Sequence, residues 1–181
     1  MLSADKAWQV LNEAELVFTE QEVRAAVEQL AELITERLSD KQPLVLCVMG
    51  GGVVFSGQLL PLLRFPLEFD YMHVTRYRGT TRGRDVSWKV EPRVRVEGRT
   101  VLVLDDILDE GETLAAVKQW LAEHGASSVY LAVVADKAIG RSKPVAADFV
   151  GVTVPNKYVF GFGMDVNDAW RNLPAIYAIR S

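Results

Sequence analysis

The most informative segment of the sequence is Val101-Leu102-Val103-Leu104-Asp105-Asp106-Ile107-Leu108-Asp109-Glu110-Gly111-Glu112-Thr113-Leu114. Four branched apolar residues run into two adjacent carboxylates, a third carboxylate stands three residues on, and a glycine and a threonine then open an amphipathic run. This order predicts a buried strand over 101–106, a tight turn, and the start of a helix. Because α/β proteins hold ligands at the C-terminal edge of a parallel sheet, the turn is expected to belong to a binding site.

The residue types in this turn suit a sugar phosphate. Backbone N–H groups at a helix start can hold a phosphate, Gly111 lets the backbone approach the anion closely, and Thr113 offers a hydroxyl. Asp105 and Asp106 can accept hydrogen bonds from both hydroxyls of a sugar diol. A structural alternative makes Asp109 a helix N-cap, with Glu112 completing a capping pair. That alternative does not explain two further carboxylates at the end of a buried strand, where unpaired charge is costly.

The rest of the chain alternates between apolar strand-like runs and segments with helical periodicity. A capping box at Thr19–Glu22 predicts a helix to about Leu38, and Gly125 is expected to stop a helix over 114–124. Strands are predicted over 44–49, 67–77, 129–134 and 149–154, and a second helix over 53–63, interrupted near Pro61. Strands that alternate with helices predict an α/β fold with a mostly parallel sheet. Residues 1–181 are expected to form one domain, with a small cap made by the two chain ends.

The composition excludes several classes of protein. The chain has 181 residues, of which 49% are hydrophobic and 24% charged, and it has no apolar run long enough to span a membrane. Its single cysteine, Cys47, excludes an internal disulfide framework and is expected to fill the core; the N-terminus does not read as a signal peptide. These features favour a cytoplasmic protein with no membrane partner. A net charge of −4 gives no overall signal for a nucleic-acid partner, so an anion site has to be local.

Two further segments have both a structural and a functional interpretation. Gly50-Gly51-Gly52 lies between a predicted strand and helix, so it is either an ordinary tight turn or a second anion-binding turn. The basic segment from Arg76 to Arg99 is either an exposed hairpin, a lid that closes over the site, or a patch for RNA. His73 and His124 form no metal-binding pattern with Cys47, and neither is assigned to the chemistry.

The stretch 101–114 resembles the phosphoribosyl-diphosphate signature of the type I phosphoribosyltransferases. The resemblance extends to the order of motifs in hypoxanthine-guanine phosphoribosyltransferases and covers most of the chain after about residue 20, through Leu44–Leu60, Arg76–Tyr77, Lys137 and Asp148–Arg171. It implies the type I phosphoribosyltransferase fold: a mostly parallel twisted sheet flanked by helices, a small hood from the chain ends, and a flexible lid at about 76–90. It also implies transfer of a phosphoribosyl group to hypoxanthine or guanine in purine salvage, with Mg²⁺ as cofactor, in a homodimer or homotetramer.

The same resemblance implies a role for each site residue. Asp109 would be the catalytic residue, managing the proton at N7 of the purine, while Asp105 and Asp106 would hold the ribose hydroxyls, directly or through Mg²⁺. The 5′-phosphate would lie in the loop Glu110-Gly111-Glu112-Thr113. The diphosphate would be bound by Gly50, Gly51, Arg76 and Arg171. On the base side, Lys137 would donate to the oxygen at C6, Tyr158 would stack on the purine, Val159 would read the edge near C2, and Asp165 would help to hold Mg²⁺.

The chain departs from the family pattern at four of these positions. A small hydroxyl residue is usual where Glu110 and Arg76 stand, a Lys or Asn where Glu112 stands, and a Lys or Arg where Gly50 stands. The two glutamates are expected to face solvent and leave the phosphate to the backbone amides. The departures leave open a non-catalytic regulator that binds RNA, and the base edge leaves open a preference for xanthine. A nucleotide-binding domain of another class is disfavoured, because no Walker motif and no Gly-x-Gly-x-x-Gly occurs.

Overall fold

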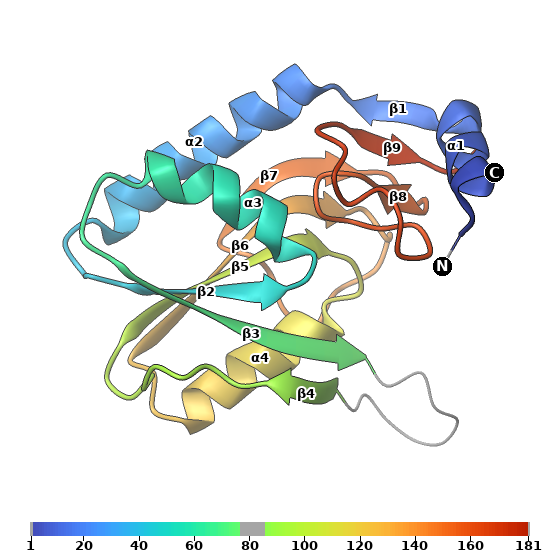
Figure 1. Ribbon diagram of the computed structural model, residues 1–181. Coiled ribbons are helices and arrows are strands. Elements are labelled where there is room, and N and C mark those ends of the chain that lie inside the picture. Colours follow the sequence, from blue (N-terminus) through green and yellow to red (C-terminus); the bar gives the residue numbers. More distant parts are fainter. Residues whose placement is uncertain (1, 77–85, 181) are drawn as a thin grey trace.

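The computed structural model describes residues 2–76 and 86–180, and its centre is a six-stranded sheet (Figure 1). The strands lie in the order β4-β3-β2-β5-β6-β7, and every neighbouring pair is parallel except β3 with β4. Their bounds are β2 Leu44–Met49, β3 Glu68–Arg76, β4 Val86–Val90, β5 Thr100–Leu108, β6 Ser128–Lys137 and β7 Phe149–Val154. The predicted mostly parallel sheet is confirmed.

Helices cover both faces of this sheet, so its middle strands are buried on each side (Figure 1). α2 (Glu20–Leu38) and α3 (Gly52–Leu59) lie over one face, and α4 (Glu112–Glu123) lies over the other. Residues Leu44–Cys47 of β2 and Val101–Leu104 of β5 are almost fully buried, which explains why these strands read as continuous apolar runs. The capping box that starts α2 is present as predicted.

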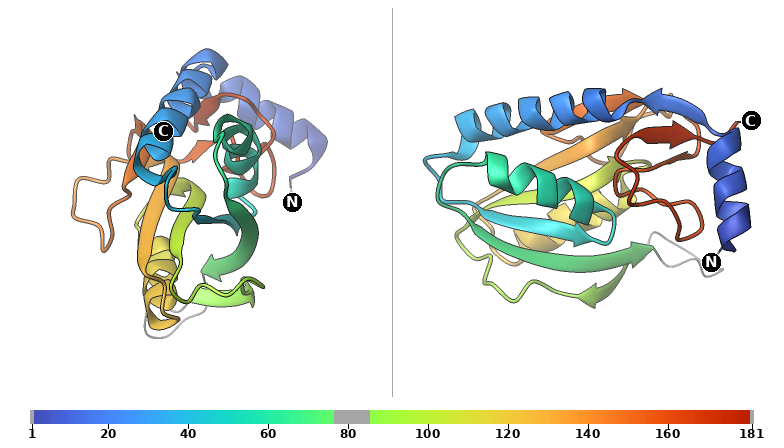
Figure 2. Two further views of the ribbon diagram at one scale, coloured as in Figure 1. Left: turned by 90° about the vertical axis from the view of Figure 1, so that its left-hand side faces the viewer. Right: turned by 45° about the horizontal axis from the view of Figure 1, so that its top comes forward.

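A second, smaller sheet lies beyond the C-terminal ends of the parallel strands (Figures 1 and 2). It consists of β1 (Glu15–Phe18), β9 (Ile176–Ala178) and β8 (Val159–Phe160), in that order and all antiparallel, and α1 (Ala4–Glu13) lies beside it. The sheet therefore joins the two ends of the chain into the predicted hood. Its strands and α1 were not individually predicted.

The structure corrects several predicted boundaries. β5 continues to Leu108, two residues beyond the predicted strand end, and the predicted helix over 53–63 is α3 followed by a short 3₁₀ turn at Leu60–Leu62, where Pro61 stands. Part of the predicted lid at about 76–90 is the strand β4, antiparallel to β3. Residues 77–85, the centre of the predicted lid, lie outside the described residues, as does the side chain of Arg76. In the described ranges, none of the helices is long and apolar enough to cross a membrane.

Candidate active site

Asp105 and Asp106 sit near the end of β5 with only 8% of each residue exposed. The N–H of Asp106 donates to Asp105 Oδ1 (2.9 Å), and the N–H of Ile107 donates to Asp106 Oδ1 (2.7 Å). Burial, followed by the neighbouring charge of Asp106, raises the pKa of Asp105 well above its usual range, and burial also raises the pKa of Asp106. Two adjacent acids with raised pKa values are suited to take up a cation or hydroxyl donors.

Two glycine-containing loops close around this acidic pair. A Cβ at Gly51 would lie 1.9 Å from Asp106 Oδ2, and a Cβ at Gly163 would lie 2.2 Å from the carbonyl oxygen of Gly51. A side chain at either place would require the neighbouring atoms to shift, because the 50–52 turn and the 161–165 loop pack with their backbones against Asp106 and against each other. The peptide bond between Met49 and Gly50 is cis.

Arg171 supplies the positive charge next to the acids. Its Nη2 lies 2.6 Å from Asp165 Oδ1, its Nη1 donates to the carbonyl oxygen of Gly163 (2.6 Å), and Nη1 lies 3.9 Å from Asp106 Oδ2. Asp165 is itself oriented by the N–H of Asp168, which donates to its Oδ2 (2.8 Å). The guanidinium side chain is still 40% exposed, so it can also contact an anion in the cavity that it lines.

The turn after β5 leads into the N-terminus of α4. Gly111 is the N-cap residue, in a left-handed conformation with φ +86°, and no side chain caps the helix. The alternative in which Asp109 caps the helix is therefore wrong. Gly111 and Thr113 line the cavity at this uncapped helix start, which is the arrangement expected of a phosphate loop.

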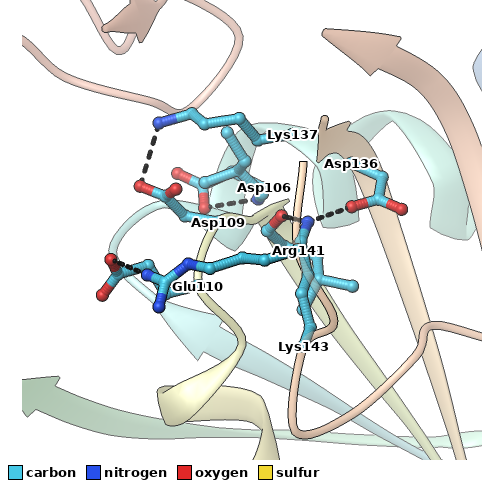
Figure 3. Close-up of polar contacts among 9 residues, drawn as sticks. Asp106, Asp109, Glu110, Asp136, Lys137, Arg141 and Lys143 are labelled. Atoms are coloured by element: carbon cyan, nitrogen blue, oxygen red, sulfur yellow. Dashed lines mark hydrogen bonds and ion pairs between the residues drawn. The ribbon is translucent and has the colours of Figure 1, made fainter. Parts of the chain in front are cut away.

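The loop that follows β6 braces this turn, a feature that sequence reasoning missed (Figure 3). Arg141 Nη2 lies 2.9 Å from Glu110 Oε1, and Lys143 Nζ donates to the carbonyl oxygen of Leu108 (2.7 Å) and to Asp136. The carboxylate of Glu110 is thus turned toward a cation rather than toward a bound phosphate. The basic residues that follow the predicted strand over 129–134 were the feature of the sequence that could have indicated this contact.

Lys137, at the end of β6, meets Asp109 across the site (Figure 3). Its Nζ lies 2.9 Å from Asp109 Oδ2, and its side chain is only 11% exposed. This pair lines a cavity of about 240 Å³ with Tyr158, Val159 and Met164. Tyr158 is 52% exposed, so its ring is accessible to a planar ligand.

Two cavities meet at the turn between β5 and α4. The first, of about 390 Å³, lies between the 50–52 turn, β5, the start of α4 and Arg171, and the second is the one beside Lys137. Both are lined by Asp106, Ile107, Asp109 and Asp165. The structure therefore brings together twelve of the predicted site residues from four separate parts of the chain: Gly50, Gly51, Asp105, Asp106, Asp109, Gly111, Thr113, Lys137, Tyr158, Val159, Asp165 and Arg171. Glu110 and Glu112, predicted for the phosphate loop, are not among the described residues that line these two cavities.

Some lining residues were not predicted. His73 and Thr75 of β3 line the first cavity, although His73 was assigned no role. β3 pairs in parallel with β2, so its C-terminal end reaches the same edge of the sheet. The order of the strands was the missing information, because the sequence does not state which strands are neighbours.

Asp105 and Asp106 are better suited to a partial Mg²⁺ site, completed by water and substrate, than to a site in which the protein supplies every ligand. Within residues 2–76 and 86–180, no group of three or more His, Cys, Asp or Glu side chains is arranged to hold a metal. Mg²⁺ usually keeps several waters and binds one or two carboxylates together with substrate phosphates. Asp105 and Asp106 supply two adjacent carboxyl groups beside a cavity that Arg171, Gly111 and Thr113 also line, which matches that kind of partial site.

Comparison with known proteins gives a consistent result. A phosphoribosyl transferase domain matches residues 15–168. The chain is 34% identical over 166 residues to a hypoxanthine-guanine phosphoribosyltransferase of Lactococcus lactis, covering 91% of this chain and 90% of the relative. It is 33% identical over 162 residues to a hypoxanthine-guanine-xanthine phosphoribosyltransferase of Tritrichomonas foetus, covering 89% and 88%. A crystal structure of a hypoxanthine phosphoribosyltransferase from Staphylococcus aureus superposes with a TM-score of 0.87 at 26% identity, covering 94% of each chain.

Proposed function

This chain belongs to the phosphoribosyltransferase family, and we propose that it transfers the 5-phosphoribosyl group from phosphoribosyl diphosphate to N9 of hypoxanthine or guanine. The products are IMP or GMP and diphosphate, which makes the reaction a step of purine salvage. The observation that carries the proposal is the Asp109–Lys137 pair, which lines the smaller cavity while Asp109 also lines the larger one. A base and a sugar diphosphate placed in these cavities would meet at Asp109.

The smaller cavity suits a 6-oxopurine. Lys137 can only donate, so it favours the oxygen at C6 of hypoxanthine or guanine over the amino group of adenine. Asp109, 2.9 Å from the same ammonium group, would face the adjacent N7. Tyr158 offers a ring for stacking, and Val159 lines the cavity where its backbone could read the edge near C2.

The larger cavity suits the sugar phosphate. The start of α4, with Gly111 and Thr113, would bind the 5′-phosphate, and Asp105 and Asp106 would hold the ribose hydroxyls. Gly50, Gly51 and Arg171 would bind the diphosphate; Arg76, at the end of β3, is expected to join them from the lid. Arg141 accounts for the unusual Glu110, because it neutralises that carboxylate next to the phosphate loop.

In the reaction, the bond between C1 of the ribose and the diphosphate oxygen breaks, and a bond from N9 of the base to C1 forms. The negative charges of Asp105 and Asp106 would favour the electron-deficient sugar carbon, as carboxylates do at oxocarbenium-like transition states. Asp109 would hold the N7 proton as the bond forms, a role that typically contributes about 10²–10⁴-fold to the rate. Mg²⁺ bound through Asp105, Asp106 and, by way of water, Asp165 would neutralise charge on the departing diphosphate.

The test is a set of initial rates with Mg²⁺, phosphoribosyl diphosphate and, separately, hypoxanthine, guanine, xanthine and adenine. Turnover of hypoxanthine or guanine with adenine inert is the expected result. Turnover of adenine at a comparable rate would contradict the role of Lys137, and no turnover by folded protein would contradict the enzyme. Xanthine is included because one relative is named for all three oxopurines. The relatives described above are all named as enzymes, so the RNA-binding alternative gains no support from them.

We also propose that the protein forms a homodimer or homotetramer. Phe69 and Tyr71 of β3 pair in register with Val45 and Cys47 on the face that α3 covers, yet they are 45% and 39% exposed. Two large side chains exposed on one face of a strand are typical of a surface that a second subunit covers. Light scattering after size exclusion would check this, with a Phe69→Ser/Tyr71→Ser double variant expected to shift the mass toward the monomer.

A further inference from the structure

The helix α1 contacts the loop that holds Arg171. The indole Nε1 of Trp170 donates to the carbonyl oxygen of Ala7 in α1 (2.8 Å). The ring of Trp8, also in α1, meets the ring of Trp170 edge to face, with centroids 4.9 Å apart. Figure 2 shows α1 beside the loops that lead to β9, at the end of the molecule where the hood lies. More than 160 residues of sequence therefore separate the two partners of this contact.

The loop between Asp165 and Arg171 has a backbone that its own sequence does not favour. Three of its residues other than glycine have positive φ: Asn167 (49°), Asp168 (68°) and Trp170 (72°). Asn and Asp tolerate the left-handed region, but a bulky aromatic residue adopts it only when the surroundings impose it. At Trp170 the surroundings include the hydrogen bond to Ala7, the ring of Trp8, and the N–H of Leu173, which donates to the carbonyl oxygen of Trp170 (3.2 Å).

The conformation of this loop decides where two site residues lie. Arg171 follows Trp170 directly, and its carbonyl oxygen accepts from the N–H of Gly163 (2.9 Å). Its guanidinium is held by Asp165 (2.6 Å), whose other oxygen accepts from Asp168 within the same loop. A shift of the Trp170 backbone would therefore move the guanidinium and the Asp165 carboxylate together.

We propose that α1 is a positioning element of the diphosphate site. Through Trp170 it holds the 165–171 loop, so that Arg171 and Asp165 face the acidic pair before any substrate arrives. The inference rests on the proposed role of Arg171 in binding diphosphate. It assigns a function to the N-terminal segment, which lies outside the matched domain at residues 15–168.

The experiment compares Trp170→Phe, which removes the N–H donor and keeps a ring, with Trp8→Ala, which removes the partner ring. In each variant the KM for phosphoribosyl diphosphate should rise by about 3- to 10-fold, the effect expected when one hydrogen bond or ring contact no longer orders a binding group. The KM for hypoxanthine should rise less, by about twofold at most, because Lys137 and Tyr158 belong to other segments and Asp165 is the one residue of the 165–171 loop among the described residues that line the smaller cavity. A role in folding alone would not separate the two KM values.

Two matched controls use the full chain. Gln9→Ala alters an exposed position of the same helix, where Gln9 pairs with Glu13. Trp120→Phe alters another tryptophan pair with the same 4.9 Å separation, on α4 against Trp88. Both controls should keep both KM values. Unchanged KM for phosphoribosyl diphosphate in Trp170→Phe and Trp8→Ala, or equal increases in both KM values, would overturn the inference.

A binding measurement separates this inference from the proposed reaction. Calorimetric titration with diphosphate and Mg²⁺ needs no turnover. If the unaltered protein binds diphosphate and Trp170→Phe binds it several-fold more weakly, the inference stands even without enzymatic activity. Equal affinity in the two proteins overturns it, and no binding by the unaltered protein overturns it together with the diphosphate role of Arg171.

Discussion

Asp105 and Asp106 are site residues whose burial lowers the folding stability of the protein at neutral pH. Both residues are buried side by side, and the neighbouring cation is Arg171, whose Nη1 lies 3.9 Å from Asp106 Oδ2. Their pKa values are raised, so the folded protein without ligand binds more protons than the unfolded chain at pH values above the unfolded pKa near 3.8. Folding stability contributed by this pair is therefore present in acid and is lost as the pH rises through the folded pKa values.

The first prediction follows from that sign. Asp105→Asn should raise the free energy of unfolding of the ligand-free protein at pH 7 to 8, because the amide has no proton to lose and so avoids the cost of ionising a buried carboxyl whose pKa is raised. The gain should shrink as the pH falls toward 4, where the unfolded chain also begins to take up the proton of Asp105. Urea unfolding over that pH range measures it. A gain that is constant with pH would contradict the assignment, and the same variant should bind phosphoribosyl diphosphate with Mg²⁺ more weakly.

The second prediction concerns Asp109. Asp109→Asn should lower kcat by about 10²–10⁴-fold while the protein stays folded, because the amide cannot exchange a proton with N7. Single-turnover rates with hypoxanthine would measure the chemical step directly. Asp40→Asn, at an exposed carboxylate paired with Lys41 far from the site, serves as the control and should leave kcat unchanged. Turnover close to that of the unaltered protein would argue against acid–base chemistry at Asp109.

At the scale of elements, the phosphate loop depends on how β5 passes into α4. Gly111 takes φ +86° and begins a helix that no side chain caps, and Gly111, Thr113 and Leu114 line the cavity there. A Cβ there would also approach Cδ of Pro144 to 3.2 Å. The loop after β6 thus packs closely against the turn and limits which residues it accepts.

The third prediction tests that turn. Gly111→Ala should lower the free energy of unfolding by roughly 1–2 kcal/mol, the cost of a left-handed alanine, and should raise the KM for phosphoribosyl diphosphate. Gly57→Ala is the matched control, since a Cβ in that turn of α3 meets nothing within 4 Å. The control should stabilise the protein by up to about 1 kcal/mol, because alanine is the better helix former. A destabilisation of equal size in both variants would show that the turn is not special.

Elements with a strong local pattern were predictable from sequence, and those held by distant contacts were not. The capping box and apolar spacing of α2, and the buried runs of β2, β5 and β6, each carry their own signal. β8 has two residues and β9 three. These short strands form because β9 pairs with β1, which lies near the opposite end of the sequence. The ion pair of Glu15 with Lys157 (2.6 Å) joins the same distant segments.

The site residues divide in the same way, into those predictable from a local motif and those placed by contacts between distant segments. Asp105, Asp106, Asp109 and Gly111 are encoded within one short motif, so their position at the sheet edge followed from local reasoning. Arg141, His73 and Trp170 reach the site only through the order of the strands and the path of the hood. No spacing rule in the sequence connects Trp170 to Ala7, and the contact becomes visible only when the chain ends meet.

At the scale of the whole molecule, the two sheets enclose the site between them. The main sheet provides the acidic pair, Asp109 and Lys137, while the hood and its loops provide Tyr158, Val159, Asp165 and Arg171. A nucleotide bound in both cavities would contact both sheets. Diphosphate alone would contact the hood only through Arg171 on the 165–171 loop. Stabilisation by ligand should therefore extend to both sheets when the ligand carries a base.

The last prediction uses this geometry. IMP at about 100 times its Kd should stabilise the folded state by roughly 2.7 kcal/mol, which raises the Tm of a domain of this size by about 5–10 °C. Because the base would lie against Tyr158 and Val159, amide hydrogen exchange should also slow in β8 and β9. AMP at the same concentration is the control and should protect the hood less, since Lys137 meets an amino group there. Protection confined to β5 and α4 with IMP, or equal protection by AMP, would mean that the base does not bridge the two sheets. The observed pattern would thereby tell whether the hood is part of the binding site or only a cover over it.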